Sequence, residues 1–484
     1  QLSVNGNSNT GSVTGNSATN TTSVTGNSVA AGSGRTVATA GALVTGSGAQ
    51  ADNALSNVQS VTGDSALASN VYGSFAVDTV AGSAIGNSTV SVSNNSQRAS
   101  SVANTATNAL GVTATNLAAT SALASQQSST ASVAASSDAE LYAPGAVSGS
   151  SVALANNRNV SLGVINDATN ALTVTAGNAT PVGATTNAVL NAAGATGDHV
   201  LSNSQAASTS VSSTASTRLY NQDRVATATT GLADSTFSIA GNATTAEASA
   251  NRADNSVTLS GAALQGSNAG LSNAQISSAA VNASSTTAAG FSLAGGVPAA
   301  TAALNSGLTI DGNSTTALAR GNAASNVLNV SAGSSYATSA SVAGSTVGAS
   351  QAAAAVLNNQ GNTGNVSSFA TASYQVALNA TAPLLVPGVS GSTVAVTGNT
   401  TAAEAYGNTA TNRVNVSAPS ASRPTAAVGN FQTNSGTVVA TATGVNYGIG
   451  VTGAAAGSTL RAAGNQVSAT AVGNSAVSTI ASVR

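Results

Sequence analysis

Few residues of this 484-residue chain carry side chains suited to acid–base or nucleophilic chemistry. Its one histidine, His199, follows Asp198, and serine is abundant, so the residue types of a Ser-His-Asp hydrolase are present. That chemistry needs the three groups to meet in space, and no spacing in the sequence indicates that they do. We expect His199 to lie in a solvent-exposed loop instead.

Two acids offer a second chemistry. Polysaccharide-cleaving enzymes need grouped carboxylates, and Asp138 and Glu140 are the closest such pair in the chain. They are followed by a Pro-Gly pair that begins at Pro144, and such dipeptides mark turns. We therefore expect the two acids in a loop that bulges from the fold, without a catalytic role.

The most polar and aromatic segment runs from Arg218 to Arg224 and contains Tyr220. A tyrosine between two arginines could contact a glycan or a protein partner. The alternative is an intramolecular ion pair between arginine and aspartate on a surface turn. We favour this alternative because it demands less of the sequence.

The sequence contains few residues that could bind a metal ion or a cofactor. The chain has no cysteine and one histidine, whereas zinc sites need several such ligands. Calcium-binding β-roll repeats need aspartate in a Gly-Gly-x-Gly-x-Asp frame, which is absent from this sequence. We expect no metal, no cofactor and no enzymatic activity.

Asparagine carries the most regular polar pattern. Three asparagines recur, separated by nine and then four positions, in six complete sets. A side-chain amide donates and accepts hydrogen bonds, so asparagines at equivalent corners of stacked repeats can bond to each other at intervals of about 4.8 Å. We predict ladders that contain asparagine only, and Asn203 falls at an irregular position outside them. The predicted members are Asn7, Asn16, Asn20, Asn95, Asn104, Asn108, Asn157, Asn166, Asn170, Asn242, Asn251, Asn255, Asn313, Asn322, Asn326, Asn399, Asn408 and Asn412.

The spacing also indicates a repeat length. The third asparagine of a set is followed seven positions later by another asparagine, as from Asn20 to Asn27, which makes a unit of 20 residues. The six sets begin 88, 62, 85, 71 and 86 residues apart, and these intervals fit three or four units of roughly 20–24 residues each. We predict an all-β chain that folds as one long β-solenoid of about 20–23 coils, a single domain over residues 1–484.

Alternation along the chain indicates which side chains face inward. Apolar residues two apart, such as Val394 and Val396, have the period of a strand with one buried face. Another arm alternates small with large side chains, and its small members Ala317, Ala319 and Gly321 are predicted to face inward. We expect the apolar arm to lie opposite this small-residue arm, so that the coil is flattened around a thin core.

Composition limits the partners and the surroundings. Charged residues are 5% of the chain and the formal net charge is −2, so no basic patch is expected to bind nucleic acid. No apolar run approaches the roughly 18 residues of a membrane span. The chain starts at Gln1, and we interpret it as the mature form of a secreted protein after removal of a signal peptide.

Repeats of about 20 residues rich in Asn, Ser, Ala and Gly, in a chain without lysine, resemble those of bacterial surface β-solenoids and fibre-forming adhesins. Curlin repeats are similar in length but pair glutamine with asparagine. In composition and repeat style the chain is most similar to the holdfast attachment (anchor) proteins of stalked alphaproteobacteria. This resemblance implies an outer-surface protein that ties an extracellular adhesive polysaccharide to an anchor in the cell envelope.

Three functions are open on the sequence. The first is a structural and adhesive protein, a rod about 100 Å long that polymerises end to end into a surface filament. In that filament Leu2 and Val4 of one copy are expected to stack on the last strand of the next, which contains Ile480 and Val483. The second is a monomeric carbohydrate-binding or carbohydrate-processing β-solenoid. The third is an ice-binding solenoid, which needs a flat Thr-x-Thr array.

Overall fold

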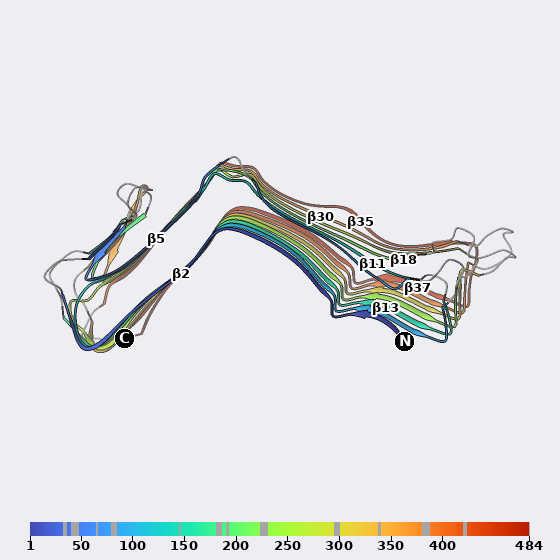
Figure 1. Ribbon diagram of the computed structural model, residues 1–484, viewed down its shortest axis with the longest axis horizontal. Helices are drawn as coiled ribbons and strands as arrows, with labels where there is room; N and C mark the ends of the chain where they lie inside the picture. The colour runs from blue at the N-terminus through green and yellow to red at the C-terminus, as the bar shows by residue number, and fades with distance from the viewer. Residues whose placement is uncertain are drawn as a thin grey trace.

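The computed structural model describes most of the chain, and the regular elements of that part are all β-strands (Figure 1). In Figure 1 the chain is seen to follow nearly the same path several times, and successive passes lie almost on top of one another. The described residues are 1–31, 36–39, 48–63, 66–78, 85–144, 147–180, 186–189, 193–222, 231–294, 301–336, 340–379, 388–419 and 424–483.

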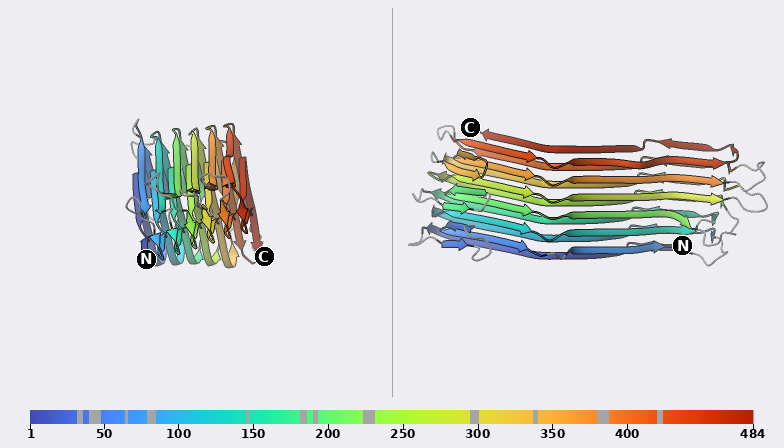
Figure 2. Two further views of the ribbon diagram at one scale, coloured as in Figure 1. Left: turned by 90° about the vertical axis from the view of Figure 1, so that its right-hand side faces the viewer. Right: turned by 90° about the horizontal axis from the view of Figure 1, so that it is seen from above.

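Each pass of the chain is called a layer here, and it has two parts. An outgoing arm of two strands runs the length of the molecule, and a return arm of three shorter strands runs back above it (Figures 1 and 2). Strands of successive layers pair in parallel, so each segment of the path becomes a sheet. The stacked parallel sheets are consistent with a β-solenoid.

Two seven-stranded sheets hold the outgoing arms. The first contains β1 (Leu2–Asn5), β8 (Thr89–Ser93), β13 (Ser151–Ala155), β20 (Thr236–Ala240), β25 (Gly307–Asp311), β32 (Thr393–Thr397) and β37 (Thr459–Ala463). The second contains β2 (Ser8–Ala30), β9 (Ser96–Ala118), β14 (Arg158–Ala179), β21 (Ala243–Leu264), β26 (Ser314–Tyr336), β33 (Thr400–Ser417) and β38 (Gln466–Val483).

Three six-stranded sheets hold the return arms. The first contains β5 (Asn53–Val61), β10 (Ser121–Ser129), β17 (His199–Ala207), β22 (Ala269–Ser277), β29 (Ala354–Asn362) and β34 (Ala426–Asn434). The second contains β6 (Leu67–Ala76), β11 (Val133–Pro144), β18 (Val211–Gln222), β23 (Val281–Ala294), β30 (Val366–Asn379) and β35 (Val438–Thr452). The third contains β7 (Ile85–Gly86), β12 (Val147–Ser148), β19 (Leu232–Ala233), β24 (Ala303–Leu304), β31 (Val389–Ser390) and β36 (Ala455–Ala456).

The predicted coil of 20–24 residues is wrong. Asn7 pairs with Asn95 across 88 residues, and the next partner, Asn157, lies 62 residues further on. Each complete asparagine set therefore belongs to a separate layer, and the outgoing sheets have seven strands, against the 20–23 coils expected. The intervals between sets are whole layers because parallel pairing in register brings the sets themselves into contact.

Long and short layers alternate. Corresponding asparagines are 88, 85 and 86 residues apart where the intervening layer contains an antiparallel hairpin, and 62, 71 and 66 residues apart where it does not. The hairpins pair with one another in a six-stranded sheet of their own beside the return arms. They are formed by β3 (Thr36–Thr39) with β4 (Gly48–Ala51), β15 (Thr186–Val189) with β16 (Ala193–Gly197), and β27 (Ser341–Ser345) with β28 (Ala349–Ala352).

The molecule is a slab, so the predicted 100 Å rod is also wrong. Seven strands stacked at about 4.8 Å extend over roughly 30–35 Å, whereas an outgoing arm of about 30 extended residues is about 100 Å long. Figure 1 accordingly looks along the stacking direction when it looks down the shortest axis. A rod or filament could form only when several copies stack.

The corners of each layer explain the Gly-Asn pairs of the sequence. Between the two outgoing strands of a layer, the residue before the ladder asparagine has a positive φ, as at Gly241 (65°) and Gly312 (62°). Glycine adopts this left-handed conformation without steric cost. Asn94 and Asn156 take the same conformation in other layers, at φ of 58° and 56°. Asparagine is the residue that best tolerates it after glycine.

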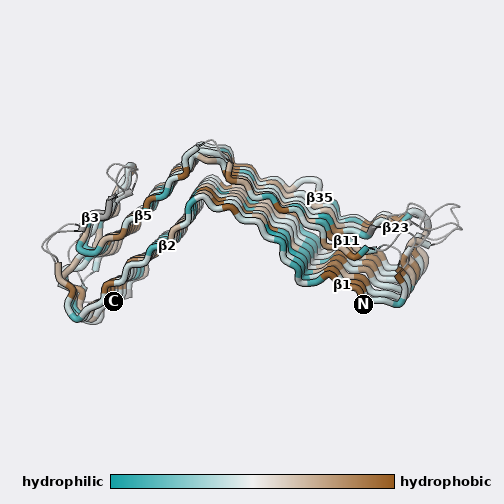
Figure 3. Tube along the Cα trace, in the orientation of Figure 1, coloured by the Kyte–Doolittle hydropathy of each residue, from teal (hydrophilic) through white to brown (hydrophobic). Residues whose placement is uncertain are grey.

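The core has a thin middle and two thicker ends. In the middle, Ala317 and Ala319 are fully buried and pack in a cluster with Val281 and Val366 of the return arm. The prediction that these alanines face inward agrees with this burial. At the β1 end, hydrophobic residues gather as a brown band beside the β1 label of Figure 3.

The predicted pairing of apolar and small-residue arms is wrong. Val394 and Val396 pack against Tyr374 and Val376, which are large side chains of the return arm. Large residues therefore face large ones at the ends of a layer, whereas in its middle the alanines of the outgoing arm face valine and alanine of the return arm. The core is thinner there, since small side chains on one arm let the two backbones approach closely.

Candidate functional site: amide ladders and terminal layers

The first asparagine ladder lies at the corner between the two outgoing strands. Each side-chain Nδ2 donates to Oδ1 of the asparagine in the next layer at 2.9–3.0 Å, and that Oδ1 also accepts the backbone N–H of the donor residue. Nδ2 of Asn157 also donates to the carbonyl of Val92, at 2.9 Å. Most of the hydrogen-bonding capacity of a buried amide is thereby used. The ladder consists of Asn7, Asn95, Asn157, Asn242, Asn313, Asn399 and Asn465.

Two further ladders lie in the middle of the outgoing arm. Asn104 donates to Asn166 at 2.8 Å and to the backbone carbonyl of Ser128 on the facing return arm, also at 2.8 Å. The second bond fixes which way the amide points. These ladders are Asn16, Asn104, Asn166, Asn251, Asn322, Asn408 and Asn474, and Asn20, Asn108, Asn170, Asn255, Asn326 and Asn412, with Ser478 at its end.

The structure thus places each of the eighteen asparagines singled out in the sequence in a ladder, but the expectation of asparagine-only ladders is wrong. A glutamine ladder runs through the first return sheet, with Gln205 donating to Gln127 at 2.8 Å. Its members are Gln59, Gln127, Gln205, Gln275, Gln360 and Gln432. The contrast drawn with curlin repeats, which pair glutamine with asparagine, therefore fails.

Asn203 also belongs to a ladder, contrary to expectation. It donates to Asn273 at 2.8 Å, and the row continues to Asn358 and Asn430. This row contacts the outgoing arm, because Asn170 donates to Asn203 Oδ1 at 3.1 Å. The sequence signal was an Asn-x-Gln motif, present at 57–59, 203–205, 273–275, 358–360 and 430–432.

The asparagine and glutamine ladders have opposite polarity. Every asparagine ladder donates towards the C-terminal layers, as from Asn322 to Asn408. The glutamine ladder donates towards the N-terminal layers, as from Gln360 to Gln275. The second N–H of Gln360 donates to the carbonyl of Thr409 on the outgoing arm at 2.8 Å, which fixes this direction. The two terminal faces of the slab therefore offer different groups.

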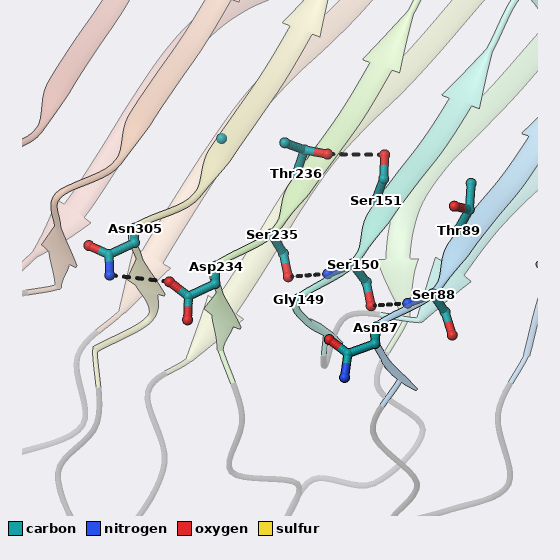
Figure 4. Close-up of a pocket in the computed structure, with 11 residues that line it drawn as sticks. Asn87, Ser88, Thr89, Gly149, Ser150, Ser151, Asp234, Ser235, Thr236 and Asn305 are labelled. Atoms are coloured by element: carbon teal, nitrogen blue, oxygen red, sulfur yellow. Dashed lines mark hydrogen bonds between the residues drawn. The ribbon is translucent and has the colours of Figure 1, made fainter.

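A serine ladder lies at the corner between the third return strand of one layer and the first outgoing strand of the next (Figure 4). It was not predicted from the sequence. The backbone N–H of Ser150 donates to Ser235 Oγ at 3.0 Å, and Ser150 Oγ donates to the carbonyl two residues before it. Outside this corner lies a recess of about 390 Å³ whose lining includes Asp234 and Asn305, which are hydrogen-bonded to each other. The ladder comprises Ser88, Ser150, Ser235, Ser306, Ser392 and Ser458.

The paired acids lie in a strand, so the expected bulging loop is wrong. Asp138 and Glu140 project from the outer face of β11. Arg218, one layer away, approaches them at 4.0 and 3.9 Å. Hydrogen bonds from Tyr220 and Tyr72 help to lower the pKa of Glu140, against the opposing effect of its partial burial. The arginine–carboxylate contact joins neighbouring strands, where a surface turn was expected, and Arg224 lies outside the described residues.

His199 is buried at the start of β17, where a solvent-exposed loop was expected. Its Nδ1 has no hydrogen-bond partner, and burial lowers its pKa from 6.5 to about 4. Beside it, Asp198 Oδ2 accepts the backbone N–H of Asn268 at 3.0 Å, and the backbone N–H of Asp198 donates to Asn268 Oδ1 at 2.9 Å. A buried, neutral imidazole of this kind is a structural group with a cost at low pH. Among the described residues, no group of three or more His, Cys, Asp and Glu side chains could hold a metal ion.

The residues expected to join copies lie on the terminal layers. Leu2 and Val4 are in β1, and their register continues through Val394 and Val396 to Leu460 and Ala462 in β37. The expected stacking of Leu2 and Val4 on the last strand is therefore out of register. That strand, β38, contains Ile480 and Val483 and continues the sheet that starts with β2.

Comparison with known proteins identifies no relative. No family model, no curated protein and no solved structure matches this chain. Among the described residues there is no helix of the length and apolarity that a membrane crossing requires. The features that bear on function are therefore the ladders, the terminal layers and the outer faces of the slab.

Proposed function

We propose that this chain is an extracellular structural protein whose copies stack head to tail into a surface filament. The observation that carries the proposal is the exposure of the terminal layers. Ile480 is 50% exposed, whereas Val414, its partner one layer below, is fully buried. Leu460 is 42% exposed above the fully buried Val394. Exposed apolar side chains of this kind are covered when another layer is added.

Ladder polarity supports a head-to-tail contact. At the C-terminal face the asparagine ladders end in Asn465 and Asn474, whose Nδ2 groups point onward, and the glutamine ladder ends in an Oε1 of Gln432. At the N-terminal face Asn7 and Asn16 present Oδ1 instead. Stacking opposite faces continues the ladders of Asn465 and Asn474 into Asn7 and Asn16 of the next copy, whereas stacking two C-terminal faces places donor against donor. An unclosed, head-to-tail contact produces a filament.

Register defines which strands would meet. β37 would pair with β1 of the next copy and β38 with β2, because these strands occupy the same two sheets. We therefore place the junction in the outgoing sheets.

The adhesive part of the proposal depends on the resemblance to holdfast attachment proteins. That resemblance supports secretion to the bacterial surface, an envelope anchor protein and an extracellular polysaccharide as partners, and a role without catalysis. Charged residues are 5% of the chain, so repulsion between stacked copies is weak. This low charge favours self-association over the solubility of single slabs.

Electron microscopy of the purified chain tests the filament. We expect ribbons about 100 Å wide, the length of one outgoing arm, with a diffraction spacing near 4.8 Å along the ribbon axis. Single slabs that persist at high protein concentration and neutral pH would contradict the proposal.

A matched pair of variants identifies the contact face. Leu460→Lys and Ile480→Lys place charges on the C-terminal face at positions already exposed in the single slab, so folding should be unaffected. They are expected to shorten or abolish the ribbons. Leu304→Lys, at an exposed leucine of an inner layer, should leave the ribbons unchanged. Equal effects of all three substitutions would show that the ribbons do not form through the terminal layers.

A further inference from the structure

The outer face of the second return sheet carries a short aromatic row that stops abruptly. Tyr142, Tyr220, Gly290 and Gln375 occupy one register position in four successive layers. Tyr142 and Tyr220 stack with ring centroids 5.5 Å apart and planes inclined by 23°. Since they belong to successive layers, their ring faces look along the stacking direction. The second face of Tyr220 is therefore turned towards Gly290, which has no side chain to cover it.

Tyr220 is held in place before any ligand arrives. Its hydroxyl donates to Glu140 Oε1 at 2.6 Å, and its ring is supported on one side by Tyr142. The backbone beside it is fixed as well, because Asn221 exchanges two hydrogen bonds with the main chain of Ser292. A fixed ring binds at a lower entropic cost than a mobile one.

The missing side chain leaves a trough on the surface. It has a volume of about 380 Å³, at the lower end of the range for small-molecule sites. Tyr220 and Gln375 are two layers apart, about 10 Å in a parallel sheet, so one ring fits between them above Gly290. The floor is apolar, and polar groups stand at the edges. The lining includes Arg218, Tyr220, Ala288, Gly290, Ser373 and Gln375.

Charge around the trough selects among ring-shaped ligands. Arg218 is the one charged residue of the lining, and its charge is balanced by two carboxylates of the neighbouring layer, Asp138 and Glu140, at 4.0 and 3.9 Å. These three groups therefore have an excess of one negative charge, which disfavours uronic acids and sulfated sugars. A neutral pyranose suits the trough, because its C–H face can lie on the tyrosine ring while its hydroxyl groups reach the polar edges.

We propose that this trough binds a neutral hexopyranose unit of an extracellular polysaccharide, stacked on Tyr220 above Gly290. The site is complete within one copy, since its residues come from layers 2 to 5. It therefore does not depend on filament formation. The trough is open at the surface, which allows a sugar in the interior of a polymer to bind as well as one at its end.

Saturation-transfer NMR on the full chain tests the site, with cellohexaose and maltohexaose as neutral probes and oligogalacturonate as the acidic one. At least one neutral probe is expected to bind, and the acidic probe is expected to bind more weakly. Tyr220→Ala should weaken neutral binding at least tenfold. Gly290→Tyr should abolish it by occupying the ring position.

Tyr406→Ala is the matched control. Tyr406 also lies on an outer face and donates to a carboxylate, Glu404, at 3.1 Å. Its loss should leave binding unchanged. Folding of each variant is checked by circular dichroism, and Tyr220→Phe, which keeps the ring and loses only the bond to Glu140, should retain most of the binding.

Several results would overturn the proposal. They are the absence of binding of both neutral probes at millimolar concentration, equal binding by Tyr220→Ala, stronger binding of the acidic probe, or equal losses with Tyr406→Ala. Each can be obtained whether or not ribbons form, so the sugar site and the filament are tested separately.

Discussion

Amide ladders connect successive layers in both the outgoing and the return arms of this slab. Only the ladders of the outgoing arm are easily recognised in the sequence. Outgoing arms, whose long strands have up to 23 residues, carry three asparagine ladders at constant spacing, and the spacing is visible in the sequence alone. Return arms consist of three shorter strands, and the segment that leads into them varies in length because alternate layers insert a hairpin. Their glutamine ladder is continuous from Gln59 to Gln432, and their asparagine ladder runs from Asn203 to Asn430. A ladder is therefore easiest to recognise in a sequence where one arm carries several members at fixed spacing, as the three outgoing asparagines do, and the return arm offers only the shorter Asn-x-Gln motif.

The close packing of the outgoing arm gives the largest expected effect. A Cβ added at Gly321 would collide with the backbone carbonyl of Gly407 in the next layer. Gly321→Ala should lower the free energy of unfolding by about 3 kcal/mol, measured by chemical denaturation. In the return arm, a Cβ at Gly361 would meet only the Thr433 hydroxyl at an ordinary 3.6 Å, so Gly361→Ala should be close to neutral. Equal effects would mean that the two arms are packed alike.

The ladders of the two arms should contribute equally to the free energy of unfolding. Asn322→Ala leaves a buried amide of Asn251 without its acceptor, and Gln275→Ala does the same to Gln360. Each should cost about 2 kcal/mol in a denaturation experiment. Asn203→Ala should cost as much. Asn282→Ala, at an exposed position of β23, is the control and should be neutral. A small effect in the return arm alone would show that its ladders are incidental to stability.

Acid should lower the free energy of unfolding through His199, which lies in the return arm. The pKa of His199 is about 4 in the folded chain and 6.5 in the unfolded one, so the unfolded state binds the proton more readily. The stability due to the neutral imidazole is complete above pH 6.5 and is lost as the pH falls towards 4. Between pH 7 and pH 5 the loss is about 2 kcal/mol.

A substitution at the same position isolates this effect. His199→Ala places in layer 3 the residue that β22 carries at this register position, Ala269. It should flatten the pH dependence of unfolding between pH 7 and pH 5, measured by denaturation at each pH. An unchanged pH dependence in the variant would assign the acid sensitivity to other groups.

One outward column of the slab shows how an ice-binding array of Thr-x-Thr is interrupted. The outward column that contains Thr107 and Thr169 continues with Asp254 and Ser325 before it returns to threonine at Thr411. Charge and size vary from layer to layer in such a column. The more regular arrays of this molecule are the amide ladders between its arms and the serine ladder at its corner.

The sequence determined the all-β class, the strand alternation and the outgoing ladders. It did so because parallel strands in register bring identical spacings into contact, and asparagine at 7, 16 and 20 recurs with the same offsets in each layer. The inward face of Ala317 and Ala319 also followed from simple alternation. These features depend only on local geometry and on distances along the chain.

Tertiary structure alone decided the length of a layer, the partners across the core, and the burial and hydrogen bonds of the isolated polar groups. A short period could be fitted to the sequence because any interval of 62 to 88 residues divides into units of about 20, and only strand pairing shows which asparagines meet. His199 and Glu140 lie in strands whose partners are tens of residues away. Their burial and hydrogen bonds are set by those distant neighbours, which spacing along the chain does not specify.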